Sequence, residues 1–424
     1  MKREFWQMCI VGTMSLALSA CAGDQETEEI PSEDQEVTLE IRNPKVEIAS
    51  QFEQLVNAYE KENPHVSIEV YTIGGAMDDY SDLKAQMAAG DGPDIFTNPG
   101  YEHAELWNDY LEDLSDEPWI DQAYEDTLSA VTFDDKIYGM PINLEGYGFI
   151  YNKDLFKQAG IHSRPETLTE LKETAEQLEE AGITPFATGY YEKWKLGDHL
   201  MNTAFAQQAD PAAFITGLNQ GTETISTNSK FKDLVTFLDV TLAYGSDDPL
   251  DTDYSMEIQA FAEEEAAMIL QGNWIQPVID QQAPNMNIGI MPIPINDDTE
   301  NDSLVVNTPG YWVVNKQTSS DKKKEAKKFL NWMVSSEEGQ VHMTEHLKFL
   351  PAFKHIDSDS SGPLAEETMD YYKDDRTLSS NWFDFPIGVR EDFGAATQQY
   401  INQDINRDEL LNEYQKSWES AQAE

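Results

Sequence analysis

The chain has 424 residues, which is more than one typical hydrophobic core accommodates and fits two lobes or domains of ordinary size. Its 28 basic and 79 acidic residues give a formal net charge of −51, and such a surface repels nucleic-acid phosphates and anionic lipid headgroups. We therefore expect no nucleic-acid partner. Two cysteines exclude a disulfide-built scaffold and any site with four cysteine ligands.

The N-terminus has the pattern of an export signal. Lys2 and Arg3 precede an apolar run, Met8–Leu18, that ends in small residues. A run of this length is too short to span a bilayer, which takes roughly 20 residues. Leu18-Ser19-Ala20-Cys21 has the form of a bacterial lipobox, so we predict a signal peptide at 1–20 and lipidation of Cys21. The alternative is an ordinary secreted protein in which Cys21 happens to stand at the cleavage site.

The next segment is strongly acidic. Asp24 to Glu36 contains seven acidic residues in thirteen and one large apolar side chain, so it cannot bury a core. We predict that residues 21–36 form a lipidated, disordered tether. The protein would then contact a membrane only through its lipid, on the extracytoplasmic face of the cell. The folded part is expected to begin near Val37.

The first half of the folded part alternates strands and helices. Periodicity and helix stop signals predict a strand at Val37–Ile41, a helix lined by Ile48, Phe52, Leu55 and Tyr59, a strand at Val66–Val70, a helix at Tyr80–Ala89 and a strand at Asp94–Phe96. Strands that alternate with helices at this spacing favour a parallel sheet covered by helices.

The same pattern recurs after residue 145. We predict strands at Phe149–Asn152, Pro185–Thr188, Met268–Gln271, Asn287–Pro294 and Gly310–Asn315, a helix opened by a capping box at Thr167–Glu170, a helix through Ala260, Phe261, Ala266 and Ala267, and a helix at Asp321–Val334. The fold class predicted from these elements is α/β with two sheets.

Several short segments carry a family resemblance because they occur together and in a consistent order. They are Ala89–Ile95, Lys136–Pro141, Ile150–Phe156, Ala159–Ile161, Pro165–Leu171, Phe261–Met268, Gly272–Trp274, and Lys324–Trp332 with the trailing Ser335–Gln340. Each is weakly specific alone, but the ordered set resembles the bacterial extracellular solute-binding proteins of family 1. These are the sugar-capturing subunits of ABC importers, a group that includes maltose-binding protein.

The resemblance implies a two-lobed fold of the periplasmic-binding-protein type II, in which each lobe is a sheet covered by helices and the ligand cleft lies between the lobes. The chain would cross between lobes near 142–146, 293–298 and 348–355. One lobe would comprise residues 37–144 and 297–350, and the other 145–296 and 351–424. The implied function is oligosaccharide binding without catalysis or a cofactor, by a monomer that delivers the sugar to the membrane permease.

Aromatic platforms are the first class of candidate site residue, because sugar rings present C–H faces that stack on them. We expect Trp274, Trp382, Trp194 and Trp312 to stack on the ligand, although each could instead pack in the core. For Trp312 the two readings are about equally supported.

Hydrogen-bonding side chains are the second class. Glu145 follows a predicted crossing segment and matches by position a hydroxyl acceptor of the family. Asn98 and Tyr101 follow the strand at 94–96, and Lys45 and Glu47 follow the first strand. All four stand at the carboxyl ends of predicted parallel strands, where α/β sheets bind ligands.

Other function classes remain as alternatives. A cell-surface carbohydrate-processing enzyme and the same binding fold with a polyol ligand are both compatible with the sequence. His342-Met343-Thr344-Glu345-His346 has the H-x-x-E-H form of a zinc peptidase, but we interpret it as a chance match on a solvated helix and expect no metal site.

Overall fold

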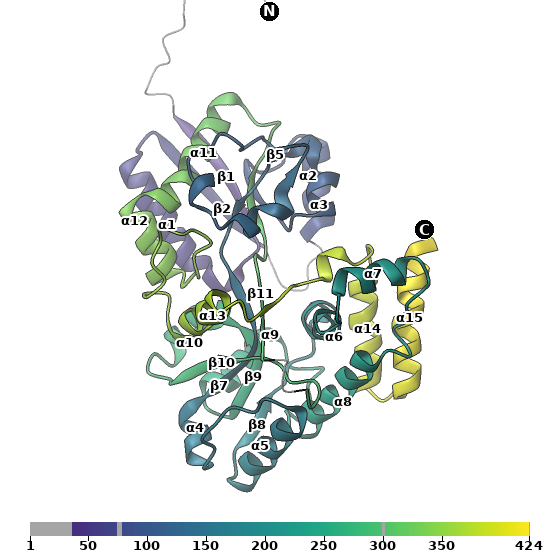
Figure 1. The fold of residues 1–424 in the computed structure, drawn as a ribbon. Coiled ribbons are helices and arrows are strands. Elements are labelled where there is room, and N and C mark those ends of the chain that lie inside the picture. The colour runs from purple at the N-terminus through teal and green to yellow at the C-terminus, as the bar shows by residue number, and fades with distance from the viewer. Residues whose placement is uncertain (1–35, 74–78, 299–301, 424) are drawn as a thin grey trace, which may run out of the picture. The chain divides into compact units, whose positions relative to one another are not determined.

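The computed structural model describes residues 36–73, 79–298 and 302–423. The predicted signal peptide, Cys21 and nearly all of the predicted tether lie outside the described residues. Residues 36–424 form one compact unit that contains two large sheets (Figure 1). We call the sheet that contains the N-terminal strand, together with its helices, the first lobe. The other large sheet and its helices form the second lobe.

The first lobe is built on a five-stranded sheet in the order β2-β1-β3-β12-β6. Its strands are β1 (Val37–Asn43), β2 (Val66–Thr72), β3 (Ile95–Asn98), β6 (Met140–Pro141) and β12 (Tyr311–Val314). β1 pairs in parallel with both β2 and β3, which confirms the predicted strand–helix order. Its helices are α1 (Ala49–Glu62), α2 (Asp79–Ala89), α3 (Glu102–Leu106), α11 (Ser320–Ser335) and α12 (Glu337–Val341), and a small ribbon joins β4 (Thr132–Phe133) to β5 (Lys136–Ile137).

Neighbouring residues of each strand serve opposite faces of this sheet. On β12, Trp312 packs with α1 and α11, whereas Val313 packs with α2 on the other side. Likewise Ile95 and Phe96 of β3 enter different cores. This alternation with a period of two is what a strand buried on both faces requires, and it explains the nearly continuous apolar runs.

The second lobe is built on a six-stranded mixed sheet. Its strands are β7 (Glu145–Asn152), β8 (Thr184–Ala187), β9 (Ala266–Gly272), β10 (Ile288–Met291), β11 (Leu304–Asn307) and β13 (Thr377–Leu378), in the order β13-β11-β7-β9-β8 with β10 also paired to β7. Its helices are α4 (Lys153–Gln158), α5 (Leu168–Glu180), α6 (Met201–Ala206), α7 (Pro211–Asn219), α8 (Ser229–Ala243), α9 (Tyr254–Ala262), α10 (Gln276–Gln282), α13 (Pro363–Lys373), α14 (Val389–Ile401) and α15 (Arg407–Ala423). The two-lobed α/β prediction is confirmed.

Two predicted boundaries need correction. The helix predicted through Ala260 to Ala267 ends at Ala262, because Glu264 adopts a left-handed backbone (φ 60°) and reverses the chain. Ala266 and Ala267 therefore begin strand β9. The return to the first lobe, expected near 293–298, comes after β11, because Val305 pairs with Tyr147 in the second sheet. The remaining lobe boundaries stay predictions.

The capping box at the start of α5 forms as the sequence indicates. The Thr167 hydroxyl accepts a hydrogen bond from the Glu170 amide at 3.1 Å. The Glu170 carboxylate reaches back to the amide of Glu166, one residue earlier than the motif usually has it, at 2.8 Å. Both bonds satisfy donors that an uncapped helix start would leave unpaired.

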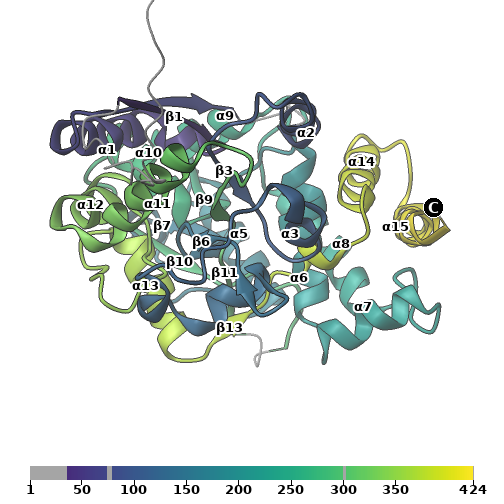
Figure 2. The same cartoon turned by 90° about the horizontal axis from the view of Figure 1, so that it is seen from above.

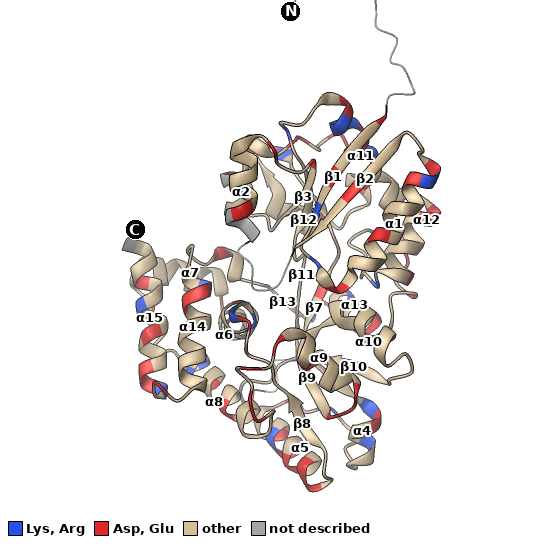
Figure 3. Cartoon of the chain, turned by 180° about the vertical axis from the view of Figure 1, so that it is seen from behind, with Lys and Arg blue, Asp and Glu red and all other residues tan. Residues whose placement is uncertain are grey.

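Helices α14 and α15 lie side by side, on the side of the fold away from α1 and α12 (Figures 1 and 2). Acidic residues mark the ribbon of α1, α5, α8, α14 and α15 alike (Figure 3). The negative charge is therefore spread over both lobes. No helix within the described ranges is long and apolar enough to cross a membrane.

A close backbone approach fixes α14 against the π-helical segment Lys195–Leu200, which carries part of the site described below. A Cβ at Gly197 would lie 1.9 Å from the carbonyl oxygen of Arg390. Only glycine fits there, because the atoms that a Cβ would meet belong to the backbone and cannot move aside as a side chain could.

We therefore expect Gly197→Ala to lower the free energy of unfolding by about 1–3 kcal/mol through overpacking. Gly310→Ala is the matched control, because the atom nearest to its Cβ would be at 3.5 Å, an ordinary contact. Urea unfolding of both variants measures the difference. Equal midpoints for the two variants would contradict the close approach.

Candidate functional site

A cavity of about 430 Å³ lies where the two lobes meet. Its size is within the range of small-molecule sites, roughly 300–1,000 Å³. The first lobe contributes Pro44, Lys45, Val46, Glu47, Ile73, Thr97, Asn98, Pro99, Ile142, Pro309 and Gly310, and the second contributes Glu145, Glu192, Trp194, His199, Tyr254 and Trp274. We call this cavity the interlobe pocket.

The sheet topology explains why these residues converge. Residues 44–47 follow β1 and Pro99 follows β3, and these two strands are parallel neighbours. In the second lobe, Trp194 comes after β8 and Trp274 after β9, which are again parallel neighbours. The carboxyl ends of two parallel strand pairs thus face the same cavity, as is usual for ligand sites in α/β folds.

A charged cluster forms one part of the pocket wall. The Lys45 ammonium donates to the Glu145 carboxylate and lies 3.5 Å from Oε1 of Glu47. The Lys45 ammonium also lies 5.9 Å from the ring centroid of Phe349. The three charged side chains are nearly buried, at 12% exposed for Lys45, 10% for Glu47 and 8% for Glu145.

Burial and pairing act on this cluster in opposite directions. Burial alone would lower the pKa of Lys45, but Glu145 and Glu47 together raise it above the usual value. Burial raises the pKa of Glu47, and the Lys45 ammonium opposes that shift. Lys45 is therefore positively charged at neutral pH, and the cluster offers both a strong donor and strong acceptors.

Aromatic rings form the other part of the wall, around His199. The His199 ring centroid lies 5.2 Å from those of both Trp194 and Trp274, and 4.6 Å from that of Tyr147. Trp274 is also parallel to Tyr147, with an interplanar angle of 5° and 6.2 Å between centroids. Half-buried Trp194 and Trp274 thus present ring surface to the pocket.

His199 stays neutral in this setting. Burial, together with the positive charges of Lys195 and Lys45, lowers the pKa of its imidazole to about 3. A neutral ring can donate from one nitrogen and accept at the other, and it packs against aromatic neighbours without a charge to solvate. The cationic content of the pocket therefore comes from Lys45.

The structure brings together six of the nine predicted ligand-binding residues. Lys45, Glu47, Asn98, Glu145, Trp194 and Trp274 all line the interlobe pocket. The Asn98 amide is engaged locally, because it accepts from the Gly100 amide at 2.7 Å and donates to the His103 carbonyl at 3.4 Å. Asn98 thus shapes the loop after β3 as well as bordering the cavity. Ligand contact by these residues remains a prediction.

The other three residues lie elsewhere. Trp312 is 1% exposed and stacks on Phe52 in the core of the first lobe, so the prediction that it lines the cleft is wrong. Strand β12 turns this residue toward α1. Trp382 is 5% exposed and packs behind His199, at 5.1 Å between ring centroids, so it offers no open face for stacking. Tyr101 is exposed and stacks on Phe383 outside the pocket lining, with ring centroids 5.9 Å apart.

Sequence reasoning missed Glu192, His199 and Tyr254. Glu192 and Trp194 stand in the same loop after β8, so the rule that selected Lys45 and Glu47 would also have selected Glu192. One Glu192 oxygen accepts from the Tyr254 amide at 2.9 Å, while the other is buried without a protein partner. No comparable sequence signal marks His199 or Tyr254. They reach the pocket only because the π-helical segment Lys195–Leu200 packs against α9.

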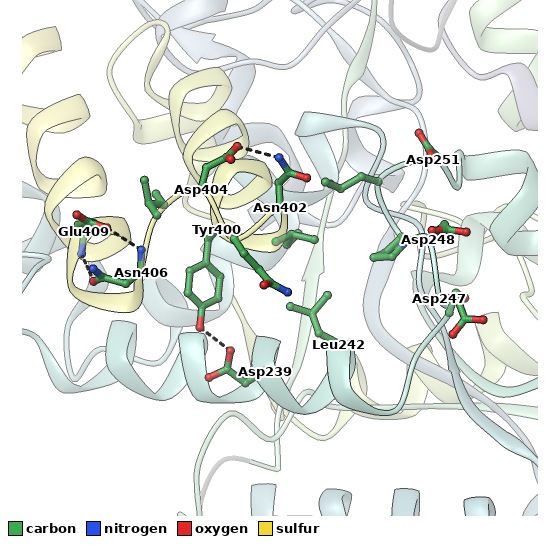
Figure 4. Close-up of a pocket in the computed structure, with 16 residues that line it drawn as sticks. Asp239, Leu242, Asp247, Asp248, Asp251, Tyr400, Asn402, Asp404, Asn406 and Glu409 are labelled. Carbon is green, nitrogen blue, oxygen red and sulfur yellow. Dashed lines mark hydrogen bonds between the residues drawn. The ribbon is translucent and has the colours of Figure 1, made fainter.

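A larger cavity of about 850 Å³ lies between α8 and the segment joining α14 to α15 (Figure 4). Its lining includes six carboxylates, from Asp239, Asp247, Asp248, Asp251, Asp404 and Glu409, with no lysine or arginine among the lining residues. Tyr400 is its one aromatic residue, and its hydroxyl donates to Asp239 at 2.6 Å. With six carboxylates and no basic side chain in its lining, this cavity lacks the paired opposite charges and the several aromatic rings of the interlobe pocket.

Neither histidine of the H-x-x-E-H segment is among the residues that line these two cavities. His342 and His346 contact each other, with 4.8 Å between ring centroids, and His342 lies 3.8 Å from Glu338. In the described part of the chain, no three His, Cys, Asp or Glu side chains are grouped so that they could hold a metal ion.

The chain is similar to known proteins in both sequence and fold. The sequence model of the family described as bacterial extracellular solute-binding protein matches residues 54–368. The chain is 25% identical to the multiple sugar-binding protein of Streptococcus mutans over 399 residues, which is 92% of each chain. It is 27% identical to the melibiose/raffinose/stachyose-binding protein of Bacillus subtilis over 57% of each chain.

Solved structures agree on the architecture. A chitin oligosaccharide binding protein superposes with a TM-score of 0.79 at 23% identity, covering 92% of this chain and all of the other. The solute-binding protein RafE in complex with raffinose superposes with a TM-score of 0.76 at 23% identity, covering 91% of this chain and 99% of the other. At this identity the likeness concerns the fold.

The neutral His199 makes a prediction about acid stability. In the unfolded chain a histidine binds a proton below roughly pH 6.5, whereas folded His199 binds one only near pH 3. The free energy of unfolding should therefore fall as the pH drops through this window, by up to about 1.4 kcal/mol per pH unit. His199→Phe removes the titrating imidazole, so the free energy of unfolding of this variant should depend less on pH.

Urea unfolding of wild type and His199→Phe at pH 7 and pH 5 measures the difference. Asp198, whose pKa burial raises to about 6, titrates in both proteins and cancels in the comparison. His162→Phe, the same change at an exposed histidine, is the matched control. Parallel stability profiles for wild type and His199→Phe would show that His199 is not held neutral.

Proposed function

Because this chain belongs to the family of bacterial extracellular solute-binding proteins, we propose that it is the oligosaccharide-binding subunit of an ABC importer. It captures the sugar in the interlobe pocket and delivers it to the transmembrane permease. Proteins of this family bind solutes and carry out no chemistry on them. The relatives named for binding multiple sugars and raffinose-type sugars support an oligosaccharide ligand.

One observation carries the proposal: the pocket combines aromatic faces with buried charged hydrogen-bonding groups. Trp194 and Trp274 offer flat apolar surface, which suits the C–H faces of sugar rings. Lys45, Glu47 and Glu145 offer charge-assisted hydrogen bonds, which suit ring hydroxyls. A polyol would use the second set but has no ring face to match the first.

The charge of the pocket favours a neutral ligand. Three carboxylates, from Glu47, Glu145 and Glu192, line it together with one ammonium group, while His199 is uncharged. An anionic ligand would meet net repulsion in a site of low dielectric constant. The buried Glu192 oxygen without a protein partner instead calls for a donor, which a sugar hydroxyl supplies.

We further propose that the protein is a lipid-anchored monomer. The family places it outside the cytoplasm. Thioether-linked lipid at Cys21, followed by the acidic tether, would keep the binding unit near the membrane and its permease. The hydrated carboxylates of the tether resist both collapse and adhesion to anionic lipid.

Oligosaccharide binding should increase the free energy of unfolding by RT ln(1 + [L]/Kd), and it should therefore raise the melting temperature. Trp274→Ala should weaken binding by about 1–3 kcal/mol through loss of the ring face. Trp332→Ala is the matched control, because Trp332 is also half-buried but packs on Tyr59 in the first lobe. Calorimetry with a panel of neutral oligosaccharides tests both. Absence of binding by wild type across a broad panel would refute the proposed function.

The anchor makes a separate prediction. Cys21→Ser should move the protein from the membrane fraction to the culture medium, because the residue that would carry the lipid is gone. Metabolic labelling with palmitate should mark wild type and leave the variant unlabelled. Purified variant should retain ligand affinity, since the pocket begins at Pro44. Equal membrane retention of both proteins would contradict lipidation at this residue.

A further inference from the structure

A buried polar network lies behind the aromatic wall of the interlobe pocket. Its members are Lys195, which is 6% exposed, and Glu257 and Gln271, each 1% exposed. None of the three is among the residues that line the pocket. The network therefore does not contact the ligand directly. Any effect it has on binding must act through the pocket residues that it hydrogen-bonds or supports.

An ion pair is the centre of the network. The Lys195 ammonium donates to Glu257 and also to the backbone carbonyl of Gly189. The Glu257 carboxylate accepts in addition from the Gly189 amide at 3.0 Å and from the Gln271 amide nitrogen at 2.8 Å. Burial raises the pKa of Glu257, while Lys195 and these hydrogen bonds favour its charged form.

The network ends on the indole of Trp274. The amide oxygen of Gln271 accepts from Nε1 of Trp274 at 3.1 Å. Because the amide nitrogen of Gln271 is engaged by a carboxylate, only its oxygen is left to face the indole N–H. The charge on Glu257 thus sets the orientation of Gln271, which in turn sets the rotation of the Trp274 ring.

The ring is confined from its other side as well. A Cβ at Gly272 would lie 2.0 Å from Cζ3 of Trp274, so the indole rests on a glycine backbone. Tyr147 and His199 pack against the same ring. One hydrogen bond and three contacts therefore define the plane that Trp274 offers to the pocket.

The same ion pair reaches the rest of this wall. Gly189, bound through both its amide and its carbonyl, begins the loop that carries Glu192 and Trp194. Glu257 belongs to α9, whose first residue Tyr254 donates its amide to Glu192 at 2.9 Å. A loop and a helix that supply pocket residues, and the strand that leads into Trp274, are thus joined at one buried point.

A contribution to the stability of the fold does not by itself explain why this ion pair is buried. Removing two charges from water costs several kcal/mol per ion, and replacing a buried ion pair by apolar residues of similar volume is often neutral or stabilising. A fully satisfied polar network does, however, hold its members in one arrangement. Affinity for a rigid ligand depends on such pre-organisation.

We propose that Lys195, Glu257 and Gln271 are positioning residues, which fix the Trp274 ring and the Glu192–Trp194 loop before the ligand arrives. The inference rests on the proposed function for its consequence, a gain in oligosaccharide affinity. Its structural part, the control of Trp274 by Gln271, concerns the ligand-free protein and stands on its own.

The first experiment needs no ligand. Protein labelled with 5-fluorotryptophan gives one ¹⁹F resonance per tryptophan, and Trp274→Phe assigns the resonance of interest. Gln271→Met keeps the volume of the side chain but removes the acceptor for the indole. It should shift or broaden the Trp274 resonance and leave those of Trp332 and Trp418 in place.

Two variants bracket this result. Gln207→Met is the matched control, because Gln207 is a buried glutamine of the second lobe that donates to the Ile293 carbonyl, outside the pocket lining. It should leave the Trp274 resonance unchanged. Gly272→Ala crowds the ring from its other side, and its Cβ also meets the Gly146 carbonyl oxygen at 2.3 Å, so it shows the size of shift that a moved indole gives only in protein that remains folded. An unchanged Trp274 resonance in Gln271→Met would overturn the proposal.

The second experiment measures coupling in affinity. Gln271→Met should weaken binding of the best neutral oligosaccharide about three- to tenfold, the range expected for one hydrogen bond. In the Trp274→Phe background, which has no indole N–H, the same substitution should weaken binding less than about twofold. Equal losses in both backgrounds would show that Gln271 does not act through Trp274.

The ion pair is tested by replacing it whole. Glu257→Leu alone should lower the melting temperature strongly, because it leaves the Lys195 charge buried and unpaired. The double variant Lys195→Met, Glu257→Leu should recover most of that loss, yet bind the oligosaccharide at least tenfold more weakly than wild type and show an altered Trp274 resonance. Wild-type affinity in a folded double variant would overturn the positioning role. If wild type binds no sugar at all, the proposed function fails, while the ¹⁹F result still decides the positioning of Trp274.

Discussion

The pocket depends on where the chain crosses between its two sheets. Ile142 and Glu145 line it at the crossing from β6 to β7, and Pro309 and Gly310 line it at the return from β11 to β12. Beside the first of these crossings, Leu144 forms an isolated bridge with Leu350. The crossing segments thus hold the carboxyl ends of both sets of parallel strands at a common cavity. A site assembled this way draws on both lobes, so closing the lobes by a hinge motion would change its geometry directly.

Charge is used very unevenly in this chain. Acidic residues outnumber basic ones by 79 to 28, and the acids lie over the outer helices of both lobes (Figure 3). Yet two of the 22 lysines, Lys45 and Lys195, are nearly buried at or behind the pocket, and each is paired with at least one glutamate. Their shared field also helps to keep His199 neutral. The outer charge concerns solubility, whereas the inner pairs define the site, because a charge out of water acts on its neighbours far more strongly than one at the surface.

The tryptophans show how far sequence reasoning reaches. The family resemblance and the stacking chemistry of sugars predict Trp194 and Trp274 as site residues, and both border the pocket. Trp312 stands at an equally suggestive place, after Pro309-Gly310, but it packs on Phe52. The difference is one of place along the strand: Trp312 lies within β12, whose two faces are both buried, whereas Trp194 and Trp274 come after strands, beyond their carboxyl ends. Composition and spacing bring an aromatic residue to the neighbourhood of a site, while the twist and register of the sheet decide where its ring points.

The sequence by itself determined the α/β class, the order of strands and helices in the first lobe, the capping of α5 and the residues that follow the parallel strands. These features are local, because periodicity, caps and turn residues act within a few positions of the chain. The tertiary structure alone decided that β11 belongs to the second sheet, that His199 and Tyr254 reach the pocket, and that Lys195, Glu257 and Gln271 meet behind Trp274. Those contacts join residues far apart in the chain, 62 positions for Lys195 and Glu257 and 158 for Tyr147 and Val305, or bring together elements that only the packed core aligns. Buried polar partners of this kind leave no periodic trace in the sequence, since each is defined by the neighbour that compensates its burial.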